Sequence, residues 1–197
     1  FNGEFWRVFD GFIVPCVPSN GTIVDLGCGP GLFLRDISMR FPHVALSGFD
    51  VTGAMIDYAR ELTYEREAPE FLQLDLTQES IPISDGSVNL VTMTAVMHLF
   101  DDPLSILAEI RRILSRTHGI FLLYDWVRTS IGSYLDSRNL SDSETWNTND
   151  KNMFRLFPHH NRYTARDWRW LLNRGGFRVR TMVRPREHFI LFIAGPS

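Results

Sequence analysis

The most informative stretch of the chain is VDLGCGPGLFL, residues 24–34. It contains one acid, Asp25, and then three glycines at alternate positions, Gly27, Gly29 and Gly31. Glycine has no Cβ and can adopt positive φ, so this backbone can turn sharply and let a ligand approach closely. The apolar residues before the glycines predict a short strand, and those after them predict a helix whose first amides can bind an anionic group. The stretch therefore predicts a loop that binds a ligand against the main chain.

The composition limits the classes of protein to which the chain can belong. It has 197 residues, 44% of them hydrophobic, which suits a single domain over residues 1–197. The net charge of −3 argues against a nucleic-acid-binding protein, which normally has a strongly basic surface. Cys16 and Cys28 lie in no metal-ligand or disulfide pattern.

The chain also has no apolar run of the ~18 residues that span a membrane. The sequence begins FNGEFWRVFD, which lacks the pattern of a secretory signal. We expect a cytoplasmic protein with no membrane partner. Because the chain does not begin with Met, a larger polypeptide is one possibility for its context, and a homodimer is another.

Strand and helix signals alternate along most of the chain. Apolar runs predict strands at residues 22–27, 43–50, 70–75, 88–96 and 119–126. Helical periodicity predicts helices at residues 31–41, 53–67, 103–114 and 164–176, the last with Thr164 as its N-cap. Strands separated by helices of this length indicate a parallel, doubly wound α/β sheet with helices on both faces.

Three further segments lie outside this alternation. Residues 1–18 begin with a helix whose aromatic face includes Phe5, Phe9 and Phe12; we expect it to pack on the domain, with a lid over a ligand as the alternative. Residues 127–161 are polar without clear periodicity, which is typical of a functional insertion near a substrate site or of disorder. Residues 177–196 contain two apolar runs joined by two residues, too few for a parallel crossover, so they predict an antiparallel hairpin.

Two acids distinguish between the possible nucleotide-type ligands. Asp50 ends the second predicted strand, where it can accept hydrogen bonds from both hydroxyls of a ribose. That feature also fits a nicotinamide-dependent oxidoreductase, whose G-x-G-x-x-G pattern would place glycine at Leu32 instead of Gly31. A second acid, Asp75, ends the third predicted strand, and the terminal hairpin departs from a plain dinucleotide fold.

With these features the chain resembles the class I S-adenosylmethionine-dependent methyltransferases, especially the branch that methylates small molecules. VDLGCGPG is nearly identical to the first motif of that family, and the resemblance extends over about residues 20–195. It implies a mostly parallel seven-stranded sheet in the order 3-2-1-4-5-7-6, with strand 7 antiparallel. It also implies S-adenosylmethionine as the cofactor, and the acids suit its sulfonium and ammonium groups better than a basic phosphate-binding loop would.

The resemblance further assigns positions around that cofactor. The glycines would pass beneath its methionine part and Asp25 would lie near its amino group. Asp50 would bind the ribose, Asp75 the adenine edge, and Thr94 the sulfonium side. The full set of expected cofactor residues is Asp25, Gly27, Cys28, Gly29, Gly31, Asp50, Val51, Met55, Asp75, Leu76, Thr94 and Ala95. Met55, Met93 and Met97 are also good core residues, because methionine fills irregular gaps.

The acceptor is less well defined by the sequence. The segment after the fourth strand, TAVMHLFDDP, lacks the Asn/Asp-Pro-Pro-aromatic signature of relatives that methylate bases, which leaves a small molecule such as a secondary metabolite or a carrier-bound intermediate. An acceptor that must lose a proton needs a base, and His98, Asp125 and His159 (or its neighbour His160) are the candidates.

Each candidate base also has a purely structural alternative, a turn histidine or a capping acid. Trp6, Phe5, Trp126, Trp146 and Phe157 could line an apolar substrate site or pack in the core. The histidines and acids have no fixed ligand spacing, so no metal is expected. A methyltransferase-like domain that only binds cofactor or a partner is the alternative function.

Overall fold

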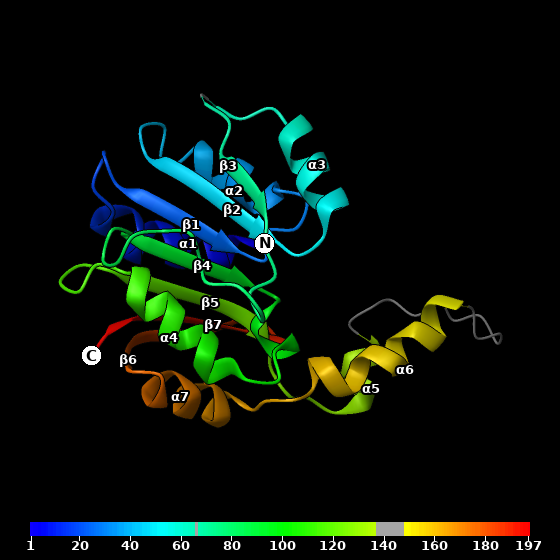
Figure 1. The fold of residues 1–197 in the computed structure, drawn as a ribbon. Coiled ribbons are helices and arrows are strands. Elements are labelled where there is room, and N and C mark those ends of the chain that lie inside the picture. Colours follow the sequence, from blue (N-terminus) through cyan, green and yellow to red (C-terminus); the bar gives the residue numbers. More distant parts are fainter. Residues whose placement is uncertain (66, 137–147) are drawn as a thin grey trace.

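The computed structural model describes residues 1–65, 67–136 and 148–197, which fold around a seven-stranded sheet (Figure 1). The strand order is β3-β2-β1-β4-β5-β7-β6. The strands are β1 (Thr22–Leu26), β2 (Ala45–Asp50), β3 (Glu70–Gln73), β4 (Leu90–Thr94), β5 (Ile120–Trp126), β6 (Phe177–Arg186) and β7 (Phe189–Pro196). β1 to β5 are parallel, whereas β7 pairs antiparallel with β5 and β6. The predicted fold, strand order and terminal hairpin are confirmed.

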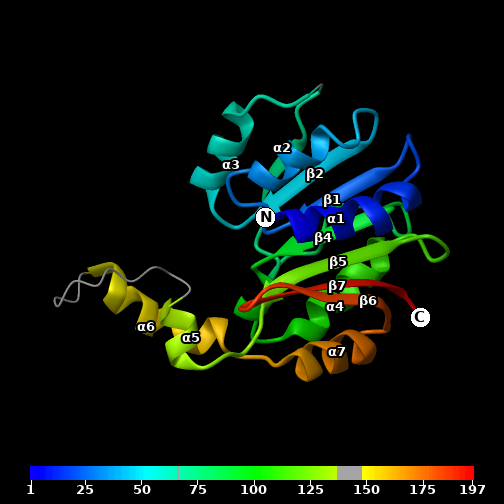
Figure 2. The ribbon, with the colours of Figure 1, turned by 180° about the vertical axis from the view of Figure 1, so that it is seen from behind.

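Helices cover both faces of the sheet. On one face lie α1 (Gly3–Phe12), α2 (Leu32–Ser38) and α3 (Gly53–Glu61), seen in front in Figure 2. On the other face lie α4 (Pro103–Ile113) and α7 (Ala165–Arg174). Alternate residues of each strand point to opposite faces, so Ile23 packs with the first set of helices and Val24 with the second. The result is one apolar core on each side of the sheet.

The helix at the N-terminus packs on the domain. Phe5 and Phe9 are fully buried, and Phe5 lies with Phe1, Phe33 and Tyr124 in a cluster of aromatic rings. Phe12, which the periodicity placed on the same face, is instead 50% exposed. The helix ends there, and a 3₁₀ turn, η1 (Val14–Cys16), leads to β1.

Several elements are shorter than their apolar patterns predict. β4 ends at Thr94 because Ala95 adopts φ 57°, which no strand residue can have. β3 ends at Gln73, so Asp75 lies in the loop that follows. α3 ends at Glu61, and the hydroxyl of Tyr64 folds back to donate to the carbonyl of Ala59 at 2.8 Å. The same carbonyl also accepts a hydrogen bond from the amide of Leu62 at 3.3 Å, so the last turn of the helix is capped by two donors.

The polar segment at residues 127–161 contains two helices that its sequence did not predict. These are α5 (Ile131–Asp136) and α6 (Thr148–His160), which project from the edge of the sheet where β4 and β5 end (Figures 1 and 2). Trp146 lies outside the described residues. The segment leads into α7, where Thr164 and Asp167 form the two reciprocal hydrogen bonds of a capping box. Within the described ranges, no helix has the length and apolar character needed to cross a membrane.

Candidate active site

A cavity of about 610 Å³ opens at the carboxyl ends of β1, β2 and β4. This is the edge where parallel α/β sheets bind their ligands, and the volume is within the usual range for a cofactor site. Nine of the twelve residues expected to contact the cofactor line it: Gly27, Gly29, Asp50, Val51, Met55, Asp75, Leu76, Thr94 and Ala95. The remaining three, Asp25, Cys28 and Gly31, are buried and do not line it.

Gly31 and Gly29 of the glycine loop are required for different reasons. A Cβ on Gly31 would come within 2.6 Å of the Tyr64 hydroxyl and 2.8 Å of the Ala59 Cβ, so this glycine permits α2 and α3 to pack closely. A Cβ on Gly29 would meet nothing within 4 Å and would project into open space at the cavity wall. Both residues have positive φ. Gly29 therefore leaves room for a ligand, whereas Gly31 leaves room for the protein itself.

Asp50 joins the loop to the end of β2. One of its carboxylate oxygens accepts a hydrogen bond from the amide of Gly29 at 2.9 Å, and the other accepts one from the amide of Thr52 at 2.8 Å. Each carboxylate oxygen can accept a second hydrogen bond. Asp50 can thus hold the loop and still bind two hydroxyl groups from the cavity.

Asp25 is fully buried beneath the loop. Its Oδ1 accepts a hydrogen bond from the hydroxyl of Thr92 at 2.6 Å, while its Oδ2 has no partner among the described residues. Burial raises the pKa of this carboxyl to about 7, against the lowering effect of the Thr92 bond, and the charge of Asp50 raises it further. A buried oxygen without a partner is costly, so this site favours either a proton or a cationic donor nearby.

Asp75 and Ala95 also line the cavity. Hydrogen bonds from the side chain and backbone amide of Thr77 lower the pKa of Asp75, which therefore stays ionised. Ala95 keeps its unusual φ with the help of a bond from its amide to the carbonyl of Tyr124 at 2.8 Å. Positive φ in a residue with a Cβ is strained and is often found at functional sites.

The three methionines and Cys28 differ in their burial and in their position relative to the cavity. Met93 and Met97 are buried in the core, whereas Met55 is 43% exposed and lines the cavity. Cys28 is buried, and burial raises the pKa of its thiol, so it is held as a neutral apolar side chain.

Six lining residues were not expected from the sequence: Thr52, Leu74, Thr77, Val96, Leu99 and Phe100. Each is adjacent or close in sequence to an expected residue, at the end of β2, β3 or β4. Extending each expected contact along the loop that follows its strand would have found them.

His98 and Asp125 form a buried pair beside the cavity. His98 lies on the 3₁₀ turn η2 (Met97–Leu99), and its Nδ1 is 2.7 Å from Asp125 Oδ1. The same carboxylate accepts hydrogen bonds from the backbone amides of His98 at 3.1 Å and Trp126 at 2.7 Å. Because the carboxylate accepts all these hydrogen bonds, the His98 ring must donate from Nδ1. In the neutral imidazole this leaves Nε2 as an acceptor.

The two histidines at the end of α6 have different surroundings. His159 is exposed, whereas His160 lies against His98 with their ring centroids 5.2 Å apart. His160 also stacks on Trp126 at 4.0 Å. Successive residues on a helix point about 100° apart. His160 is therefore the one of the two that lies beside the pair, although nothing in the sequence favoured it over His159.

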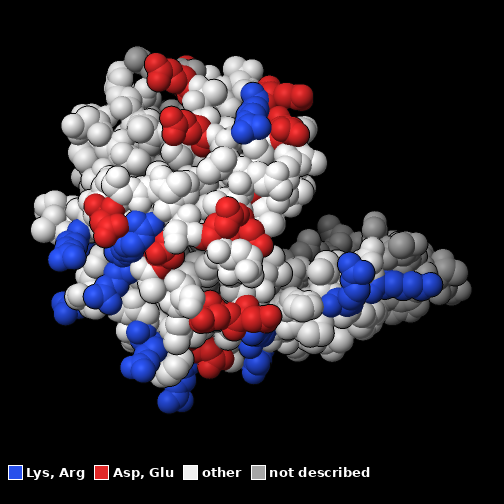
Figure 3. All heavy atoms as spheres, in the orientation of Figure 1, with Lys and Arg blue, Asp and Glu red and all other residues white. Residues whose placement is uncertain are grey.

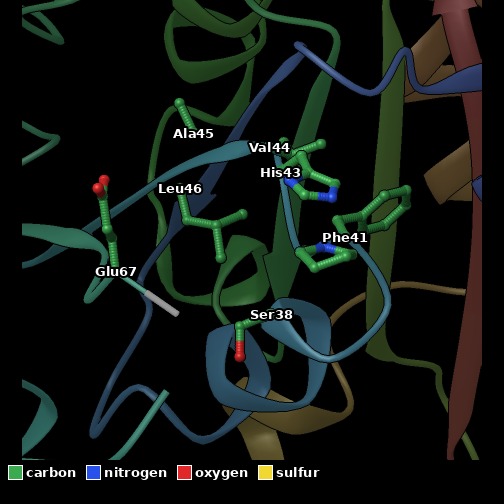
Figure 4. Close-up of a pocket in the computed structure, with 8 residues that line it drawn as sticks. Ser38, Phe41, His43, Val44, Ala45, Leu46 and Glu67 are labelled. Atoms are coloured by element: carbon green, nitrogen blue, oxygen red, sulfur yellow. The ribbon is translucent and has the colours of Figure 1, made fainter. Parts of the chain in front are cut away.

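Two other cavities lie at the opposite edge, where the strands begin. One, of about 330 Å³, is bounded by Phe41, His43 and Glu67 near the start of β2 (Figure 4). The other is lined by Arg111, Arg112, Arg116 and Arg174 near the ends of α4 and α7, on the side where basic groups gather in Figure 3. Neither contains an expected site residue. In the described parts of the chain, no three His, Cys, Asp or Glu side chains are grouped to hold a metal ion.

Comparison with known proteins gives a family match over the region that builds the cavity. Residues 24–123 match the methyltransferase domain family. The chain is 28% identical over 93 residues to a malonyl-[acyl-carrier protein] O-methyltransferase of Legionella pneumophila, covering 47% of this chain and 32% of that protein. It is 43% identical over 54 residues to a trans-aconitate 2-methyltransferase of Paracidovorax citrulli, covering 27% of this chain and 20% of that protein.

The fold comparison covers nearly the whole chain, whereas the curated relatives do not. The crystal structure of a SAM-dependent methyltransferase from Aquifex aeolicus superposes with a TM-score of 0.67 at 18% identity, over 98% of both chains. By contrast, the chain spans about a third or less of the length of the two relatives above. The family match covers the glycine loop, Asp50, Asp75 and His98. The chain belongs to the methyltransferase domain family, that is, to the class I S-adenosylmethionine-dependent methyltransferases.

Proposed function

We propose that this chain binds S-adenosylmethionine in the 610 Å³ cavity and transfers the methyl group to a small molecule at the ends of β4 and β5. The observation that carries the proposal is that nine residues from four segments, each expected from the sequence to contact the cofactor, line a single cavity. Segments far apart in the chain would not converge in this way if the individual matches were accidental.

The residues present fit the charges and shape of that cofactor. Asp50 offers two carboxylate oxygens for ribose hydroxyls, and the open space at Gly29 leaves room beside the main chain. Asp25 has a buried oxygen without a partner among the described residues, and the ammonium group of the cofactor would satisfy it directly or through a water molecule. The described residues that line the cavity include acids but no Lys or Arg, as a cationic cofactor requires.

When bound, S-adenosylmethionine supplies an electrophilic methyl group on its sulfonium. The protein then has to position the acceptor in line and exclude water. A hydroxyl acceptor must also lose its proton, and His98 Nε2 is the base that we propose, with Asp125 holding the neutral ring in the required tautomer. In this assignment Asp125 positions the base and His159 takes no part.

The acceptor class is a small molecule or a carrier-bound intermediate. Two relatives with this domain are a malonyl-[acyl-carrier protein] O-methyltransferase and a trans-aconitate 2-methyltransferase, and their names describe acceptors of this kind. A carboxylate acceptor needs no base, so the effect of H98A on turnover would distinguish a carboxylate from a hydroxyl.

The cofactor can be tested before any acceptor is known. S-adenosylhomocysteine should raise the melting temperature of the chain, because a ligand that binds only the folded state stabilises it, and NAD should not. A shift with NAD and none with S-adenosylhomocysteine would refute the proposal. Transfer of labelled methyl from S-adenosylmethionine to a panel of hydroxylated and carboxylated compounds then tests turnover; binding without transfer would instead favour the non-catalytic alternative.

A further inference from the structure

The His98 ring is enclosed by side chains from two elements beyond its own turn. Asp125 of β5 is hydrogen bonded to its Nδ1, and the His160 ring from α6 meets it at 76°. The side chain of His98 is only 3% exposed. Among the described residues, His160 thus supplies a ring that covers the proposed base, whose Nδ1 is bonded to Asp125.

His160 is itself held in two directions. Its Nδ1 lies 2.8 Å from the hydroxyl of Tyr134 on α5. Its ring is parallel to the indole of Trp126, with an interplanar angle of 4°. The stack fixes the plane of the imidazole and the hydrogen bond fixes its rotation within that plane. Both Tyr134 and Trp126 are buried, so neither contact is a loose surface contact.

The backbone around His160 is anchored next to the His98 turn. The guanidinium of Arg128 donates to the carbonyls of Asn161 at 3.0 Å and Arg162 at 2.7 Å. The guanidinium of Arg162 in turn donates to the carbonyl of Phe100 at 2.8 Å. These bonds join the two ends of the α5–α6 segment to each other and to the loop after His98. The position of His160 is therefore set by residues close to it in the structure.

We propose that His160 is a positioning residue for His98 and that, through Tyr134, it connects the base to the α5–α6 segment. This inference rests on the proposed role of His98. One hydrogen bond to Asp125 fixes Nδ1 but allows the ring to tilt about that atom. The His160 ring restricts this tilt and keeps water away from His98. Packing of α5 and α6 then determines how well the base is held.

Among the described residues, the charged and titratable groups that face His98 are Asp125 from β5, His160 from α6, and Arg162, whose guanidinium is 3.5 Å from the His98 carbonyl. Of these, His160 is the one whose ring lies against the imidazole. Removing the His160 ring admits water to the proton that His98 shares with Asp125. That proton should then exchange faster with solvent.

The experiment follows the imidazole nitrogens of His98 by NMR in the 15N-histidine-labelled 197-residue chain, with H98Q to assign the signals. In the native chain the signals should show the tautomer with the proton on Nδ1. In H160A the Nδ1 proton of His98 should exchange with solvent several-fold faster than in the native chain. H159A is the matched control, since it removes an adjacent exposed histidine, and its exchange rate should equal that of the native chain.

A second variant guards against misfolding of H160A. Y134F keeps the ring stack and deletes only one hydroxyl, and it should speed the exchange of the His98 proton by a smaller factor. Equal exchange rates in the native chain, H159A and whichever of H160A and Y134F folds would overturn the inference. Equal acceleration in H159A and H160A would overturn it as well, because it would show a general loosening of α6.

Failure of this inference can be distinguished from failure of the proposed function. S-adenosylhomocysteine binding, measured by calorimetry, should be the same in the native chain, H159A and H160A. If the native chain does not bind it, the proposed cofactor is wrong whatever His98 does. With an acceptor in hand, H160A should lower kcat and leave the KM for S-adenosylmethionine unchanged.

Discussion

Asp50 Oδ2 accepts a hydrogen bond from the backbone amide of Gly29 at 2.9 Å, which joins the end of β2 to the loop that follows β1. The same side chain lines the proposed cofactor cavity. One carboxylate thus both shapes the loop and is available to the ligand. Removing this carboxylate should weaken ligand binding for two reasons. The ligand loses its contacts with Asp50, and the glycine loop loses a hydrogen bond that holds it.

D50A should therefore weaken S-adenosylhomocysteine binding by about tenfold or more, since hydrogen bonds to a charged group contribute roughly 1.5–3 kcal/mol. Isothermal titration calorimetry measures this directly. D57A removes an exposed acid of α3 that pairs with Arg60, and it should bind as the native chain does. Unchanged affinity in D50A would contradict the ribose assignment.

Asp25 should make the stability of the fold depend on pH. Its pKa is raised from 3.8 to about 7, so between these values the folded chain keeps a proton that the unfolded chain has lost. The unfolding free energy should then fall as pH rises through this window, by at most ~1.4 kcal/mol per pH unit. Urea denaturation at several pH values should show this fall in the native chain and not in D25N. Parallel curves for the two proteins would show that Asp25 titrates normally.

The same carboxyl should couple cofactor binding to pH. If the ammonium group of the ligand lies near Asp25, binding favours the ionised carboxylate and releases a proton. The affinity for S-adenosylhomocysteine should increase between about pH 6 and about pH 8, and D25N should lose this dependence. The proton release can be checked by calorimetry in buffers of different ionisation enthalpy. An identical pH dependence in both proteins would remove Asp25 from the site.

Two glycines of one loop should respond differently to alanine. Both have positive φ, so each substitution costs about 1–2 kcal/mol of backbone strain. G31A also forces a Cβ against Tyr64 and Ala59, so its loss of stability should be the larger. G29A should lose ligand affinity beyond what its stability explains, because its Cβ projects into open space at the cavity wall. Denaturation and calorimetry on both variants decide this, and equal losses in both measurements would refute it.

The start of α7 offers a test of the fold that does not involve the site. Thr164 caps this helix, and its hydroxyl accepts a hydrogen bond from the amide of Asp167 at 3.2 Å. T164A should reduce the unfolding free energy by about 1 kcal/mol, and T164S should retain most of it. Ligand affinity should remain the same in both variants; a loss of affinity would show that α7 influences the cavity.

Local patterns determined a large part of this protein. The alternation of strand and helix signals predicted the parallel sheet, and the two residues between the last apolar runs required an antiparallel hairpin. The glycine loop with Asp50 and Asp75 pointed to one cavity because the carboxyl ends of parallel strands lie at one edge of a sheet. Each of these inferences depends on backbone geometry and spacing, which neighbouring residues in the sequence are sufficient to fix.

Features that depend on contacts between distant segments became visible only in the three-dimensional structure. It places Gly31 against Tyr64 and leaves Gly29 open, although both are glycines of one loop. It shows two helices in a polar segment whose apolar residues are too sparse to reveal a period. It also shows that His160, and not His159, lies against His98. Which side of α6 is covered depends on the segments that pack against it. The sequence determined what the chain folds into, and packing determined which side chains meet.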